Sequence, residues 1–87
     1  MGRELVGRQL AACCQVISDL TSFFVWKGKK EEAKEALLVV KTATPRLSQT
    51  LDYMRRYHPY ELPELIILSV EAVEVSYLKW ILESCKK

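Results

Sequence analysis

The feature that most constrains this fold is a β-favouring stretch from Cys13 to Trp26, which ends at a Lys27-Gly28 turn signal. Valine, isoleucine, threonine, phenylalanine and tryptophan are frequent in the stretch. Alternate side chains of a strand share one face. An unbroken strand would therefore gather five even-numbered residues on one face: Cys14, Val16, Leu20, Phe24 and Trp26. We expect a long strand followed by a tight turn.

The segment after the turn carries two conflicting signals. Lys29 to Leu38 is rich in lysine, glutamate, alanine and leucine, which is the composition of a good helix. Leu37 to Val40 is instead an aliphatic run typical of a buried strand, and Lys41-Thr42 follows it. The residues by themselves do not decide between a helix and a strand for this segment.

Two further segments predict helices. Arg3 to Leu10 favours a short helix that begins abruptly. Thr44 followed by Pro45 is typical of an N-cap and a first helical turn, and Pro59 is expected to end that second helix. An apolar stripe at helical spacing supports it: Leu47, Leu51 and Met54.

The C-terminal third predicts one strand and one helix. Leu65 to Val70 is a β-rich apolar run, suited to a strand buried on both faces. Ser76 is expected to cap a final helix, whose apolar stripe is Leu78, Ile81, Leu82 and Cys85. The elements together predict an α+β fold, and the 87-residue length predicts one domain, residues 1–87.

Composition excludes several classes of function. The net charge of +2 and the scattered basic residues argue against a nucleic-acid partner. We expect no targeting segment and no membrane span. Three cysteines (Cys13, Cys14 and Cys85) cannot all pair within one chain, which favours a reducing, cytoplasmic location. No Gly-rich phosphate loop, zinc-protease motif or serine-hydrolase motif is present.

Five motifs follow one another in a specific order: Leu10-Ala11-Ala12-Cys13, Thr21 to Lys29, Leu37 to Thr42, His58-Pro59-Tyr60-Glu61 with Pro63-Glu64, and Tyr77-Leu78-Lys79-Trp80. In this order they resemble motifs of the CutA (divalent-cation-tolerance) family and cover nearly the whole chain. The resemblance implies a ferredoxin-like antiparallel sheet packed by helices. It also implies a homotrimer in which strands pair between subunits, and it assigns Lys30 to Thr42 to a strand.

The sequence departs from the family pattern at its N-terminus. Family members begin with a strand and a full first helix, whereas Arg3 to Leu10 resembles only the end of that helix. The resemblance therefore implies a fold truncated at the N-terminus, with a gap between the strand ending near Val40 and the strand starting near Leu65. Gln15 also replaces the usual asparagine, and Phe24 replaces the usual tyrosine.

Two residues match the ligands proposed for metal binding in the family, Cys13 and His58. Thiolate and imidazole suit copper and zinc, so the resemblance implies copper or another divalent ion, weakly bound. His58 is the only histidine, and two ligands do not close a site. The alternative is that Cys13 is a buried packing residue and His58 makes a local hydrogen bond before Pro59.

Two other groups have both a functional and a structural interpretation. Glu61 and Glu64, near Tyr60, could form an acid/base pair, but no nucleophile accompanies them, and structural partners are the simpler interpretation. We therefore predict that the protein is not an enzyme. Four aromatic residues could form an interaction surface, although we expect them in the core and the trimer contact: Phe23, Phe24, Trp26 and Trp80.

The function implied by the resemblance is tolerance of divalent metals, with copper leading, by a non-catalytic and self-associating protein. The alternative is an interaction scaffold that helps to localise or anchor a membrane-associated enzyme. Metal dependence distinguishes the two, because a scaffold would bind its partner equally well in the presence of a chelator.

Overall fold

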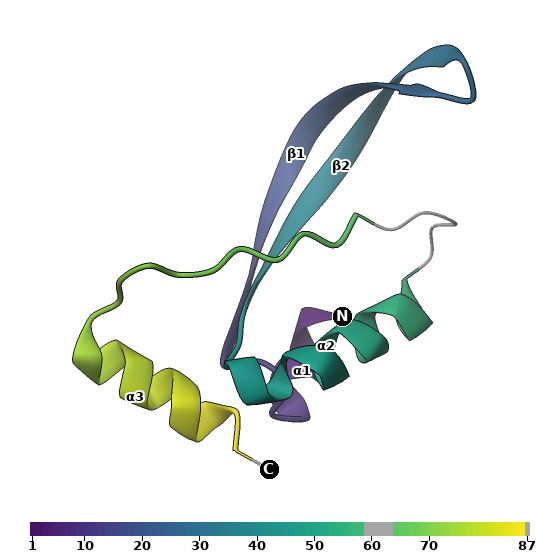
Figure 1. The fold of residues 1–87 in the computed structure, drawn as a ribbon. Coiled ribbons are helices and arrows are strands. Elements are labelled where there is room, and N and C mark those ends of the chain that lie inside the picture. The colour runs from purple at the N-terminus through teal and green to yellow at the C-terminus, as the bar shows by residue number, and fades with distance from the viewer. Residues whose placement is uncertain (59–63, 87) are drawn as a thin grey trace.

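The computed structural model describes residues 1–58 and 64–86 (Figure 1). Figure 1 shows a long hairpin that projects away from the helices gathered near its base. The elements in chain order are α1 (Gly2–Gly7), β1 (Cys13–Trp26), β2 (Lys29–Lys41), α2 (Thr44–Tyr57) and α3 (Val75–Ser84).

The β1–β2 hairpin closes at the turn that the sequence predicts. Lys27 and Gly28 both have left-handed backbone conformations, with φ of 51° and 80°. Two successive positive φ angles give the two-residue turn whose twist matches that of paired strands. The predicted strand from Cys13 to Trp26 and its turn are therefore confirmed.

Cross-strand pairing decides the segment whose residues left helix and strand open. Lys29–Lys41 is strand β2, antiparallel to β1, with Cys13 opposite Lys41 and Trp26 opposite Lys29. Pairing with β1 along this length gives hydrogen-bond partners to backbone N–H and C=O groups that would otherwise bond to one another within a helix. Tertiary context has overridden the helical composition, and the strand implied by the family resemblance is confirmed.

A β-bulge divides the apolar face expected for β1. Ile17 pairs with Leu37 and Leu20 pairs with Glu35, so β1 takes three steps where β2 takes two. Asp19, inside the bulge, has a φ of 61°. One extra residue reverses the faces beyond it. The expected single face is therefore wrong: Cys14 and Val16 share one face, and Leu20, Phe24 and Trp26 share the other.

The helices begin or end at different residues from those predicted. Helix α1 ends at Gly7, earlier than the expected Leu10. The N-cap of α2 is Ala43 and that of α3 is Glu74, so the capping roles predicted for Thr44 and Ser76 are wrong. A side-chain cap stabilises by only about 1 kcal/mol, which packing of the whole helix readily exceeds. Pro45 does lie in the first turn of α2.

Two small hydrophobic clusters form the core at the base of the hairpin. The first contains Leu5, Leu10 and Ala11, against which Leu38 and Met54 pack. The second lies beside α3 and contains Ala12, Ala43 and Cys85, with Ile81 packed against it. The clusters place α1, α2 and α3 around the same end of the sheet and leave the distal part of the hairpin exposed.

The carbonyl oxygen of Leu10 links the segment before β1 to the segment after β2 and to α2. The hydroxyl of Thr50 in α2 donates to it at 2.8 Å, and the hydroxyl of Thr42 donates to it at 2.6 Å. Thr50 is 2% exposed. A buried hydrogen bond of this kind is costly to break, because the polar group left behind stays desolvated.

The strand predicted from Leu65 to Val70 is not formed. The backbone there is extended but belongs to no sheet, since the described part of the chain contains one sheet, of β1 and β2. Expected burial on both faces is also wrong, because Ile66 is 70% exposed and Leu68 83% exposed. A strand needs a neighbour to pair its backbone groups, and no described strand pairs with this segment.

We expect Thr50→Val to lower the free energy of unfolding by about 1–2 kcal/mol, because it removes a buried hydroxyl that lies 2.8 Å from both the Leu10 and the Arg46 carbonyl oxygens. Urea denaturation measures the effect. Thr44→Val, an exposed position in the first turn of α2, is the matched control and should change stability by less than about 0.5 kcal/mol. Equal effects of the two substitutions would contradict an anchoring role for Thr50.

Candidate functional site

Cys13, the first predicted metal ligand, lies at the base of the hairpin. It is the first residue of β1, opposite Lys41 of β2, and its side chain is half-buried. Neighbouring strand residues point to opposite faces, so the thiol of Cys14 does not share the environment of the Cys13 thiol. The two thiols of the vicinal pair therefore have different neighbours, although both are half-buried.

Cys14 has a different environment. It packs against the cluster of Leu5, Leu10 and Ala11. Partial burial, followed by the adjacent Cys13 thiol, raises the pKa of Cys14. A raised pKa favours the protonated thiol, whereas metals bind the thiolate. Cys14 is therefore suited to packing more than to coordination.

Cys85 is a structural residue of the α3 junction. It is 4% exposed and caps the C-terminus of α3. Its Sγ lies 3.7 Å from Oγ1 of Thr42, the same hydroxyl that donates to the Leu10 carbonyl. The apolar stripe predicted for α3 is buried only in part, because Leu78 and Leu82 are 40% and 45% exposed.

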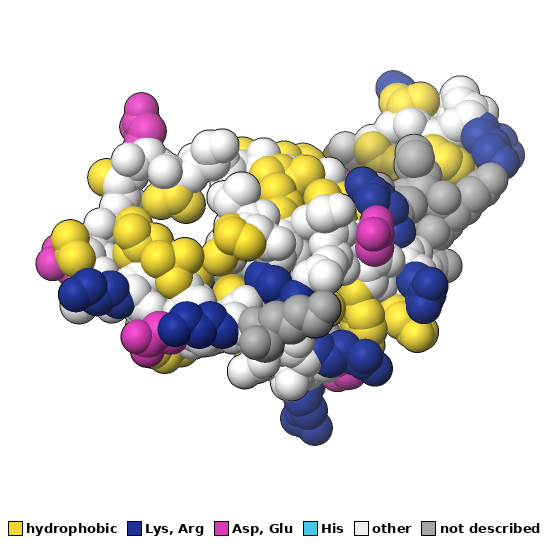
Figure 2. Space-filling model, turned by 60° about the horizontal axis from the view of Figure 1, so that its bottom comes forward, with side chains coloured by type: hydrophobic (Ala, Val, Ile, Leu, Met, Phe, Trp, Pro, Cys, Tyr) yellow, Lys and Arg dark blue, Asp and Glu magenta, His cyan; other side chains and the backbone are white. Residues whose placement is uncertain are grey.

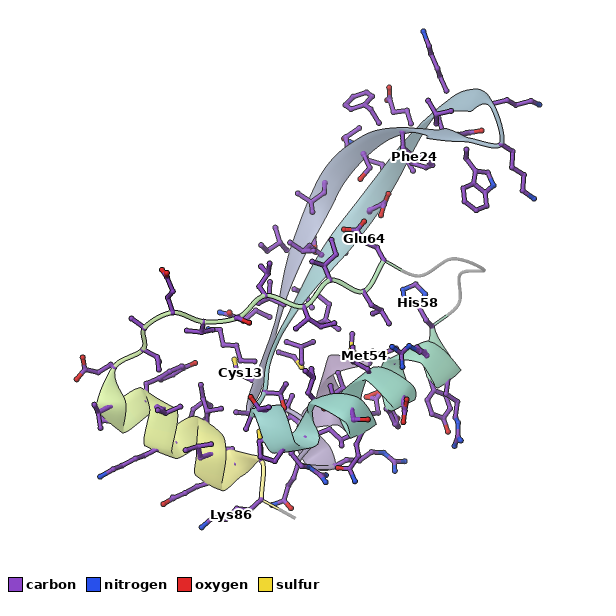
Figure 3. All side chains as sticks on the ribbon, viewed as in Figure 1. Cys13, Phe24, Met54, His58, Glu64 and Lys86 are labelled. Carbon is purple, nitrogen blue, oxygen red and sulfur yellow. The ribbon has the colours of Figure 1, made fainter. Side chains whose placement is uncertain are left out.

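His58, the second predicted ligand, lies at the other end of α2. It is the C-cap of that helix and is half-buried. Cys13 pairs with Lys41, two residues before the N-cap of α2, so the 14 residues of α2 separate the two side chains by about 20 Å. Figure 3 shows Cys13 at the base of the hairpin and His58 at the far end of α2.

The described residues of one chain do not make a closed metal site. Among residues 1–58 and 64–86, no three His, Cys, Asp or Glu side chains gather closely enough to hold an ion. Cys13 and His58 therefore do not share an ion within one chain. Of the predicted carboxylate pair, Glu64 is exposed at the start of the extended segment, while Glu61 and Tyr60 lie outside the described residues.

The distal hairpin exposes aromatic side chains. Phe23 is 75% exposed, Phe24 42% and Trp26 38%, and Trp80 of α3 is 46% exposed. Their expected placement in the core is wrong: Phe23, Phe24 and Trp26 lie where β1 and β2 extend beyond the helices that cover the base, and Trp80 is exposed on α3. Figure 2 shows one face of the molecule, on which hydrophobic side chains are exposed around a hollow. The three hairpin residues near the turn therefore present exposed aromatic side chains.

A further group, which sequence analysis did not single out, surrounds a cavity of about 400 Å³ beside α2. Arg46, Gln49, Tyr53 and Arg56 contribute to its lining from α2, and Arg8 contributes from the turn after α1. The α2 residues are spaced by three or four positions and so lie on one helix face. The shared face of the α2 residues could have been recognised from their spacing in the sequence. The contribution of Arg8 could not, because it depends on the tertiary fold.

Comparison with known proteins identifies the family. The sequence model described as CutA1 divalent ion tolerance protein matches residues 1–84. The chain belongs to the CutA1 family. The resemblance drawn from the five sequence motifs is therefore confirmed.

The curated relatives of the chain are longer than the chain itself. It is 47% identical over 81 residues to "Protein CutA homolog" of Xenopus laevis, and the match covers 93% of this chain and 54% of that protein. The chain spans about half the length of this and two other CutA relatives. The family assignment therefore concerns the shared segment.

Solved CutA structures share the fold. The divalent cation tolerance protein of Thermus thermophilus is 34% identical with a TM-score of 0.92, covering 98% of this chain and 82% of that chain. The periplasmic divalent cation tolerance protein CutA of Archaeoglobus fulgidus is 31% identical with a TM-score of 0.91, covering 97% and 81%. The predicted α+β, ferredoxin-like class, truncated relative to these structures, is confirmed.

No helix within residues 1–58 and 64–86 combines the length and the apolar character required to cross a bilayer.

We expect a version that carries a CutA-type first strand and first helix ahead of Met1 to have a higher urea midpoint than the 87-residue chain. The added strand would cover exposed apolar side chains such as Ile66 and Leu68, and burying each of these stabilises by about 1.5–3 kcal/mol, against about 5–15 kcal/mol for a whole domain. An extension of equal length made of glycine and serine is the control. An unchanged midpoint with the CutA-type extension would contradict the gap beside residues 65–70.

Proposed function

We propose that this chain is a non-catalytic, self-associating CutA protein that contributes to tolerance of divalent metals, with copper as the leading metal. The observation that supports this function best is the family match over residues 1–84. The family description names ion tolerance and no chemical reaction. We further propose that residues 1–87 act as one domain in the cytoplasm, where the three free thiols would stay reduced.

Self-association is supported by the apolar surface that the isolated chain exposes. Phe23 and Val25 are 75% and 66% exposed near the hairpin turn, and Leu68 and Val70 are 83% and 76% exposed in the extended segment. Exposed apolar patches and unpaired strand edges usually mark interfaces or cause aggregation. In the proposed homotrimer, closed symmetry would cover these surfaces with the same surfaces of other copies.

Metal binding is proposed to be weak and to depend on Cys13. Its half-buried thiol lies nearer to solvent than the buried thiol of Cys85. A strong copper or zinc site needs more ligands than one thiolate. His58, at the far end of α2, would bind an ion separately from Cys13 of the same chain. In this proposal copper is cargo that the protein handles, and it does not hold the fold together.

We expect light scattering to give a mass near 30 kDa, about three times the 10.0 kDa of one chain, because three copies would cover the exposed apolar surfaces. Phe23→Gln should shift the protein toward smaller species. Lys79→Gln, an exposed change on α3, is the control and should leave the mass unchanged. A well-folded monomer near 10 kDa at all concentrations would contradict the proposed trimer.

Copper titration under reducing conditions tests the role of Cys13. Loss of a residue that merely supports a ligand weakens metal binding by about 10–100-fold, so Cys13→Ser should weaken Cu(I) binding at least about tenfold. Cys85→Ser should change it little, because that thiol is buried beside Thr42. Equal losses in the two variants would indicate non-specific capture of copper by thiols and would contradict the proposed site.

A further inference from the structure

The cavity beside α2 is rich in guanidinium groups, and we call it the arginine pocket. It is an open hollow on the surface, with a volume of about 400 Å³. Three arginines contribute to the lining, together with two tyrosine rings and one carboxylate: Arg8, Arg46, Arg56, Tyr53, Tyr57 and Asp52. None of these residues belongs to the proposed metal ligands or to the exposed hairpin surface.

The positive charge of the arginine pocket is not neutralised by nearby acids. In the described ranges, Arg8, Arg46 and Arg56 take part in no ion pair. The carboxylate in the lining, Asp52, already accepts a hydrogen bond at 3.2 Å from Arg55, which is not part of the lining. Three guanidinium groups and one carboxylate leave an excess of two positive charges around the cavity.

Two of the three guanidinium groups are held in place by their neighbours. Arg46 donates through Nε to the carbonyl of Gln9 at 3.2 Å and through Nη2 to the carbonyl of Arg8 at 3.3 Å. The guanidinium of Arg8 lies over the ring of Tyr53, 5.0 Å from its centroid. These contacts fix the turn after α1 against α2 and so hold Arg8 and Arg46 on the same side of the hollow.

Arg56 and Tyr57 contribute to the lining from exposed positions. Arg56 is exposed on the same face of α2, three residues after Tyr53. Tyr57 is 55% exposed, and its ring centroid lies 4.6 Å from that of Tyr53. Arg56 can therefore move toward a ligand that Arg8 has already engaged, and the tyrosine hydroxyls can donate further hydrogen bonds.

We propose that the arginine pocket binds a small phosphate-bearing dianion, with the phosphate group between Arg8 and Arg56 and beside Arg46. The excess of two positive charges matches the charge of a phosphate monoester at neutral pH. Planar guanidinium groups also match the oxygen geometry of phosphate and can donate two hydrogen bonds at once. The proposal does not depend on metal tolerance or on the oligomeric state.

Isothermal titration of the 87-residue protein with inorganic phosphate at low ionic strength tests the proposal. Saturable binding is expected, and Arg56→Gln should weaken it by about tenfold, the typical effect of losing one charge-assisted hydrogen bond. Arg3→Gln is the matched control, since it makes the same charge change on α1 outside the pocket. Asp52→Asn should tighten binding, because it removes the negative charge from the lining.

Arg8→Gln should also weaken binding, and its urea midpoint separates a binding effect from a loss of packing against Tyr53. Phosphate affinity should rise as pH increases through the second ionisation of inorganic phosphate, which converts the monoanion to the dianion, whereas sulfate affinity should not. Absence of saturable phosphate binding to the unsubstituted protein would overturn the proposal. So would equal weakening by Arg56→Gln and Arg3→Gln, which would show general electrostatic attraction.

Discussion

Backbone pairing between β1 and β2 is the interaction on which the rest of this structure depends. The register places Cys13 opposite Lys41, which brings the residues before β1 beside those after β2. The backbone N–H of Ala12 donates to the carbonyl of Lys41 at 2.8 Å and continues the ladder. Only then can Thr42 and Thr50 both reach the Leu10 carbonyl and fix the base of the hairpin.

Local sequence patterns predicted the elements whose signals depend on neighbouring residues. The strand up to Trp26, the Lys27-Gly28 turn and the second helix follow from β propensity, turn chemistry and helical spacing. Lys29–Lys41 could not be assigned from its own residues, because pairing with β1 overrides its helical composition. The bulge was not predicted either, although Asp19 is of a residue type that is rare in strands and tolerates a left-handed backbone, and the bulge reverses the faces of half the strand.

The candidate sites were predictable in part for the same reason. Cys13 and His58 could be selected by residue type and family motif, but their separation follows from the length of α2. The arginine pocket combines a turn and a helix face, so only the fold brings Arg8 to Tyr53. Leu65 to Val70 was predicted to be a strand buried on both faces, which is wrong. Its side chains are exposed because the described residues provide no neighbouring strand to pair with the segment.

The most direct test of this account is the NMR backbone chemical shifts of Lys29–Lys41, because this segment separates cross-strand pairing from local propensity. Pairing with β1 predicts strand-type Cα and Cβ shifts throughout the segment, with the register change confined to the residues around Asp19. Helical shifts from Lys29 to Leu38 would contradict it. They would show that local composition, rather than pairing with β1, determines this part of the fold.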